Sequence, residues 1–212
     1  PYEPFEFQSE DGTWTGFDMD IMRAVAERYG LALEVTVQPF DGIWLAPKAG
    51  TCDVVASSLT ITEERDKIVD FSDPYIIVQQ GVLMRVEDAG KTIDDFKSGA
   101  MRLASQNGTT NAALGEELVG RDNLALFDAF NNAVVALQNG DVDGVIIDST
   151  SAAAYEQEFA GELTVAITGL SSDPLGLVFQ EGSELQDAFN EGLQAIKDDG
   201  TLNELIIKWW PK

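Results

Sequence analysis

The sequence predicts an α/β protein in which short apolar strands alternate with amphipathic helices. Residues 17–29 place apolar side chains at helical spacing on one stripe, and Gly30 provides a helix stop. Short apolar runs such as 124–127 and 144–147 have the length of buried strands and are bounded by turn residues. No apolar run approaches the roughly 18 residues that a membrane-spanning helix needs. Helices layered on sheets are therefore expected.

The first part of the chain is predicted to contain three further elements between the helix at 17–29 and a short helix that begins after Thr62. Pro47 interrupts the helical pattern around it, so the helix there is expected to be weak. Thr62 can cap a short helix whose first turn carries Glu63 and Glu64, where acidic side chains favour the positive helix end. The three elements are a strand at 33–37, the weak helix at 41–49 and a buried strand at 54–56.

A second α/β unit follows an extended apolar stretch at 76–84. The tail returns to strong helix signals, with one capping box formed by Ser183 and Gln186 and another by Thr201 and Glu204. The two units are expected to abut directly, joined by extended crossings near 79–86 and 168–178. Within the second unit we expect strands at 102–104, 124–127, 144–147 and 163–167, and helices at 108–118, from an Asp128 cap to Gly140, and at 149–159.

The composition excludes several classes of function. The chain carries 37 acidic and 13 basic residues, a net charge of −24, which argues against binding a nucleic-acid backbone. Two interpretations of this charge are compatible with the sequence: a solvated acidic surface, or an acidic funnel that attracts cationic ligands. There is no histidine, so Ser-His-Asp and Cys-His catalysis and histidine-ligated zinc are excluded. Cys52 is the only cysteine; no intrachain disulfide can form, and we expect a small buried filler.

A cluster of hydroxyl side chains ending in an arginine is the first candidate for a binding site. Ser57, Ser58 and Thr60 follow a predicted strand, and Arg65 comes within the next helical turn. The planar guanidinium group is suited to bidentate capture of a carboxylate. An arginine after such a turn is also a common surface or capping residue, so this cluster alone is weak.

The second unit carries two features that strengthen this hypothesis. Thr109 and Thr110 stand at a predicted helix start, where free N–H groups attract anions. Asp148 follows four apolar strand residues at the edge where ligands bind in open α/β sheets. Its alternative role is to cap the next helix, and both roles are compatible. An arginine, a helix start and an aspartate together can bind the carboxylate and ammonium groups of an amino acid.

Five motifs extend over nearly the whole chain. They are Phe5-Glu6-Phe7, Gly16-Phe17-Asp18-Met19-Asp20, Ser57-Ser58-Leu59-Thr60-Ile61-Thr62-Glu63-Glu64-Arg65, Val69-Asp70-Phe71-Ser72-Asp73-Pro74-Tyr75 and Asp198-Asp199-Gly200-Thr201-Leu202. In their order and spacing these motifs resemble those of the polar amino-acid-binding proteins of bacterial ABC importers.

The resemblance implies a two-lobed type II periplasmic-binding-protein fold, with mixed sheets flanked by helices and a cleft at two hinge strands. Lobe one would comprise residues 1–82 and 171–212, and lobe two residues 83–170. Family members begin with a hydrophobic strand ahead of the segment at which this chain starts. We therefore expect an unpaired sheet edge in lobe one, and a Tyr2 position exposed to fraying at a chain end.

By motif match, Arg65 would bind the ligand carboxylate with Ser58, Thr60 and Thr110, while Asp148 and Ser58 would bind its ammonium group. Tyr2 and Phe40 match positions at which the family holds the ligand side chain between aromatic rings, although Phe40 also fits a core position. The resemblance implies no catalytic or metal-binding residue. The candidate ligand-binding residues are Tyr2, Phe40, Ser57, Ser58, Thr60, Arg65, Gln106, Thr109, Thr110 and Asp148.

The expected function is that of an extracytoplasmic solute-binding protein that closes its lobes on an amino acid and delivers it to an ABC permease. Ser57-Ser58-Leu59 resembles the binders of basic amino acids, and Gln106 and Asn111 are neutral where acidic ligands would need a cation. A polar or cationic L-amino acid is therefore expected. The protein would be a periplasmic or membrane-anchored monomer without cofactor, its signal peptide removed. The alternatives are a sensor domain of a receptor kinase or channel, and a cyclohexadienyl (prephenate or arogenate) dehydratase.

Overall fold

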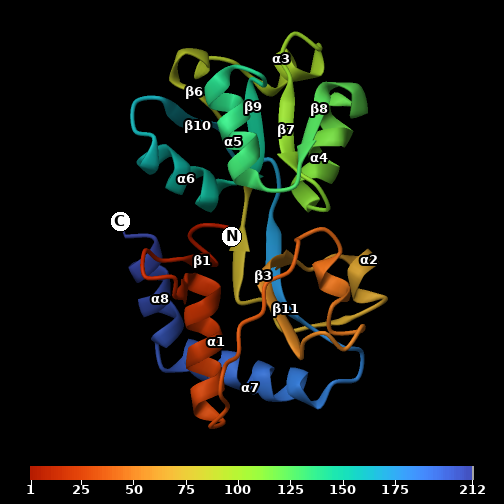
Figure 1. The fold of residues 1–212 in the computed structure, drawn as a ribbon, viewed down its shortest axis with the longest axis vertical. Coiled ribbons are helices and arrows are strands. Elements are labelled where there is room, and N and C mark those ends of the chain that lie inside the picture. The colour runs from red at the N-terminus through yellow and green to blue at the C-terminus, as the bar shows by residue number, and fades with distance from the viewer. Residues whose placement is uncertain (212) are drawn as a thin grey trace. The chain divides into compact units, whose positions relative to one another are not determined.

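The computed structural model describes residues 1–211, which form two compact units. Each unit combines a sheet with packed helices, and the chain passes between the units more than once (Figure 1). Unit 1 contains residues 1–38, 42–77 and 174–211, and unit 2 contains residues 39–41 and 78–173.

Unit 1 is built on a sheet whose strand order is β3-β11-β4. The central strand β11 (Asp173–Phe179) runs antiparallel to β3 (Val54–Thr60) and β4 (Asp70–Phe71), and β5 (Ile76–Val78) also pairs with it. Three helices pack together in this unit: α1 (Phe17–Arg28), α7 (Glu184–Asp198) and α8 (Thr201–Trp209). The smaller elements are α2 (Glu63–Asp66), the 3-10 turn η1 (Ile43–Leu45) and a two-stranded ribbon of β1 (Phe7–Gln8) and β2 (Trp14–Thr15).

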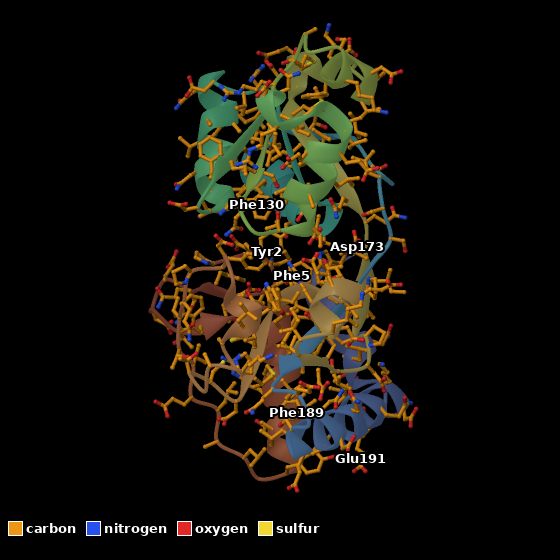
Figure 2. All side chains as sticks on the ribbon, turned by 90° about the vertical axis from the view of Figure 1, so that its right-hand side faces the viewer. Tyr2, Phe5, Phe130, Asp173, Phe189 and Glu191 are labelled. Atoms are coloured by element: carbon orange, nitrogen blue, oxygen red, sulfur yellow. The ribbon has the colours of Figure 1, made fainter. Side chains whose placement is uncertain are left out.

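Aromatic side chains join the N-terminal segment of unit 1 to its helices. Phe5 and Phe17 are fully buried, and the ring of Trp210 lies 5.4 Å from the first and 4.8 Å from the second, centroid to centroid. Tyr2 stacks on Phe5 with 5.6 Å between the ring centroids, and Figure 2 labels both residues. Such rings bury large apolar areas, so the start of the described chain is held in place rather than frayed.

Gly16, directly before α1, lies where no side chain fits. Its φ is 128°, and a Cβ atom there would lie 2.0 Å from the carbonyl oxygen of Phe5. We expect Gly16→Ala to lower the free energy of unfolding by about 3 kcal/mol or more, because backbone must move. Urea denaturation measures this. Gly12→Ala is the control, since Gly12 has φ of 83° with no atom near, and equal losses in both variants would contradict the account.

Unit 2 contains a five-stranded mixed sheet in the order β10-β6-β9-β7-β8. Strand β6 runs antiparallel to both β10 and β9, whereas β7 runs parallel to both β9 and β8. The strands are β6 (Gln80–Arg85), β7 (Leu103–Gln106), β8 (Leu124–Phe127), β9 (Gly144–Asp148) and β10 (Leu163–Ile167); the helices are α3 (Ile93–Lys97), α4 (Thr110–Val119), α5 (Phe130–Asn139) and α6 (Ser149–Glu158), with 3-10 turns η2 (Val86–Asp88) and η3 (Arg121–Asn123).

The core of unit 2 follows from the alternation of side chains along its strands. Val82 and Met84 on β6 are fully buried in a cluster that includes Phe96 of α3 and Val119 of α4. Leu83 between them is equally buried, and since successive strand residues point to opposite faces, both faces of the sheet are covered. This explains why the strands read as continuous apolar runs.

The strand predicted at 33–37 is wrong. Residues 31–37 form no strand, and Leu31 and Val37 remain 45% and 62% exposed. The alternating apolar pattern is that of a strand, but a strand needs a partner for its backbone groups. In the described sheet β3 is an edge strand that pairs only with β11. The open edge expected in this part of the chain is therefore present.

Several local predictions are also corrected. Asp128 does not cap α5, because Ala129 occupies the cap position, and Gly200 rather than Thr201 precedes α8 in a left-handed conformation. The weak helix at 41–49 reduces to the short turn η1, and Cys52 is half-buried rather than buried. The Thr62 cap and the strand at 124–127 are confirmed.

Candidate functional site

The end of β3 departs from regular strand geometry where the candidate hydroxyl residues lie. Its pairing with β11 shifts register between Gly176 and Val178. Opposite this irregularity, Ser58 has φ of 48°, the only positive φ of a non-glycine residue in the part of the chain described. Such strain persists only where the surroundings impose it, and it clusters at functional sites. Ser58 is therefore held in an unusual orientation.

Arg65 is anchored beside the end of this strand. The backbone N–H of Arg65 donates to the Thr62 hydroxyl at 3.2 Å, which fixes the first turn of α2. Its Nη1 donates to the carbonyl oxygen of Thr60 at 3.0 Å. The residue is buried, and this burial lowers the pKa of its guanidinium group. A buried cation next to strand-end hydroxyls is suited to an anionic partner.

Two buried carboxyl groups lie behind this segment. Ser57 Oγ donates to Glu6 Oε1 at 2.6 Å, and the backbone N–H of Ser58 donates to Asp18 Oδ2 at 2.8 Å. Burial, and then the charge of Asp18, raise the pKa of Glu6 well above its ordinary range. Burial raises the pKa of Asp18 to about 6, although the hydrogen bond from Ser58 opposes this. The hydroxyl of Ser57 is thus directed into the interior.

In unit 2, the turn before α4 is rigidly built. Thr109 caps the helix, its hydroxyl accepting from the N–H of Ala112 at 2.9 Å and donating to the carbonyl of Gln106 at 2.7 Å. The side-chain amide of Gln106 donates to the carbonyl oxygen of Asp128 at 3.0 Å. Thr110 begins the helix. This arrangement presents a fixed helix N-terminus, a favourable environment for an anion.

Asp148 stands at the cap position of α6 but does not cap it, since its side chain makes no hydrogen bond to the start of that helix. Its Oδ1 instead accepts from Asn111 Nδ2 of α4 at 3.0 Å. Both residues are buried, at 6% and 4% exposure. A neutral partner leaves the negative charge of the carboxylate in place, so a cation can still bind to it.

Phe40 is half-buried, and the short segment Pro39–Asp41 packs with unit 2. Asp41 Oδ2 accepts from Asn107 Nδ2 at 2.9 Å, and a Cβ atom on Gly108 would lie 2.6 Å from Asp41 Oδ1. The structure therefore groups Phe40 with Gln106, Thr109, Thr110 and Asp148 in unit 2. Tyr2, Ser57, Ser58, Thr60 and Arg65 belong to unit 1.

Sequence reasoning assigned no positioning role to three residues of these groups, Glu6, Asp18 and Asn111, although the first two lie in the quoted motifs and Asn111 was considered as a neutral side chain. A signal for the first two exists, because each acidic residue stands between apolar neighbours, in Phe5-Glu6-Phe7 and Phe17-Asp18-Met19. Asn111 carries no such signal, since only the fold brings α4 beside the end of β9. Among residues 1–211 no group of three potential metal ligands occurs, and no described helix has the length and apolarity needed to span a membrane.

The whole chain matches a known protein family. The sequence model of the bacterial extracellular solute-binding proteins, family 3, matches residues 1–212. The chain belongs to this family. The mixed α/β fold of the chain matches solved periplasmic-binding-protein structures.

Three relatives illustrate the range of similar proteins. A probable histidine-binding protein of Neisseria gonorrhoeae is 29% identical over 100% of this chain and 80% of its own. The arginine-, lysine-, histidine-binding protein ArtJ of Geobacillus stearothermophilus is 30% identical, with a TM-score of 0.91, over 100% of this chain and 92% of the other. An ancestral amino acid-binding protein described as a precursor of cyclohexadienyl dehydratase is 33% identical, with a TM-score of 0.89, over 99% and 91%.

Proposed function

We propose that this chain is the solute-binding component of an amino-acid ABC importer and that it binds a polar or cationic L-amino acid. The observation that carries the proposal is Arg65, a buried guanidinium group tied to the carbonyl of Thr60 beside the strained Ser58. An amino acid supplies the carboxylate that such a group binds. Membership of a solute-binding family supports the same conclusion.

The carboxylate of the ligand is assigned to Arg65, with Ser58, Thr60 and Thr110 donating hydrogen bonds. Arg65 offers a fixed planar pair of donors, because its backbone and one Nη are already anchored. Thr110 stands at the N-terminus of α4, where the helix favours a negative charge.

The ammonium group of the ligand is assigned to Asp148. Its carboxylate is buried and is oriented by Asn111 rather than by its own helix. Burial strengthens a charge pair only when the remaining hydrogen-bonding positions are also satisfied, and Asn111 satisfies one of them. Asn111 is therefore a positioning residue for Asp148.

The cationic class of ligand is supported by two observations. Relatives with names that specify arginine, lysine or histidine match 99% and 100% of the chain. The net charge of −24 attracts cationic solutes over the surface, an effect that weakens with salt. The proposal includes ligand-driven closure, in which residues of both units bind one amino acid, and delivery of that amino acid to permease subunits from a periplasmic or extracellular location.

Thermal denaturation with each of the twenty amino acids tests this function. Arginine, lysine or histidine at 100 times its dissociation constant should stabilise the protein by about 2.7 kcal/mol. Glutamate and aspartate should have no effect, because the candidate residues offer no cation to a ligand side chain. Absence of any shift with all twenty, together with turnover of prephenate or arogenate, would favour the dehydratase over the binding protein.

A further inference from the structure

The strongest feature that the proposed function does not use is the pair of buried carboxyl groups behind the Ser57-Ser58 segment. Glu6 is 8% exposed and Asp18 is fully buried. The two lie on different segments, before β1 and in the first turn of α1, and bind adjacent serines. Two ionised carboxylates this close in the interior would repel one another and lose hydration.

The hydrogen bonds distinguish the two acids. Asp18 accepts from the backbone N–H of Ser58, and the side chain of Tyr75 also lowers the pKa of Asp18, so this group is suited to carry charge. Glu6 accepts from the hydroxyl of Ser57 through Oε1, and each acid also has one buried oxygen without a hydrogen-bond partner among the described residues, Glu6 Oε2 and Asp18 Oδ1. A buried ionised oxygen without a donor is costly, so both acids are not expected to be ionised together. Because the backbone N–H of Ser58 can only donate, it favours the ionised form of Asp18, and the proton belongs on Glu6.

We propose that the Glu6–Asp18 pair carries one proton, held on Glu6, and that both acids are positioning residues for Ser57 and Ser58. This inference rests on the proposed function, because it concerns the affinity of the ligand that Ser58 binds. While Glu6 is neutral, Ser57 and Ser58 keep the geometry in which Ser58 has φ of 48°. When Glu6 loses its proton, repulsion from Asp18 disturbs both serines, and ligand affinity falls.

The other groups that face the pair are few. The side chains of Ser57 and Ser58 lower the pKa of Glu6. Burial and the charge of Asp18 outweigh both. The pKa values of both acids are raised in the folded state, so their contribution to stability is complete at low pH and is lost as pH rises through about 6 and above. The pair therefore favours folding most at a pH below the ordinary pKa values of 4.5 for Glu6 and 3.8 for Asp18.

Calorimetric titration with arginine from about pH 7 to about pH 8.5, above the pKa of about 6 of Asp18, tests the proposal, with Glu6→Gln as the informative variant and Glu10→Gln, at an exposed position, as the control. We expect the affinity of the wild type and of Glu10→Gln to fall about tenfold or more with rising pH. Glu6→Gln, which mimics the neutral acid, should bind with nearly constant affinity. An equal fall in Glu6→Gln, or no fall in the wild type, overturns the proposal.

Two measurements without ligand separate this proposal from the proposed function. Infrared difference spectra of wild type and Glu6→Gln at about pH 7 should contain a protonated-carboxyl C=O band that only the wild type loses on raising the pH. The unfolding free energy should also depend less steeply on pH in Glu6→Gln. If no amino acid binds but the band is present, the binding function fails while the protonated pair stands; absence of the band refutes the pair itself.

Discussion

Replacing Arg65 with alanine is expected to weaken arginine binding by about 100-fold or more. Removing one partner of a buried, hydrogen-bonded charge pair costs about 2–5 kcal/mol, and each 1.4 kcal/mol is tenfold in affinity. Arg65 is buried and donates to the Thr60 carbonyl, so its guanidinium group is held in a fixed place, and alanine leaves the ligand carboxylate without that partner. Calorimetric titration with arginine measures the loss.

Two controls isolate the role of Arg65. Arg121→Ala removes an arginine whose side chain is 65% exposed, and its affinity should match that of the wild type. Agmatine, which is arginine without its carboxylate, should bind weakly to the wild type and no more weakly to Arg65→Ala. If agmatine and arginine lose affinity equally in Arg65→Ala, the guanidinium group does not bind the carboxylate.

Asp148→Asn is expected to have an effect of similar size, about 100-fold on arginine affinity. Asparagine has the shape of aspartate and its side-chain oxygen can still accept from Asn111, so the change removes charge with little change in packing. The affinity is measured by the same titration, and urea denaturation monitors the fold.

The matched control for Asp148→Asn is Asp141→Asn, at an exposed position on the turn before β9. It changes the net charge by the same amount and should leave affinity unaltered. Arginine without its α-amino group should bind equally to wild type and Asp148→Asn. A further loss with that analogue would assign Asp148 to another part of the ligand.

The sequence predicted what depends on local pattern. The strand β8 and the cap of α2 by Thr62 follow from apolar run length and from the hydroxyl at the helix start. Residues 31–37 show the limit of this reasoning, because their alternating pattern is strand-like but a strand depends on a partner elsewhere in the chain. Ala129, at the start of α5, shows that a favourable cap residue one position away does not fix a helix end.

In the candidate site, too, the residues that local pattern indicates could be predicted, whereas the contacts that depend on the fold could not. Arg65 and Asp148 could be selected from residue type and position because each follows a strand of recognisable pattern. Their anchors could not, since Thr60 accepts from Arg65 and Asn111 donates to Asp148 only after the chain has folded. The Glu6–Asp18 pair joins residues on separate segments through Ser57 and Ser58, a relation that no sequence period encodes.

The most direct test of the central claim is an NMR titration of the labelled 23.0 kDa chain with arginine. If residues of both units bind one amino acid, the backbone amide signals of Ser58, Thr60, Thr110 and Asp148 should shift together and yield one dissociation constant. Signals that shift in only one unit, or that give different constants in the two units, would contradict the account.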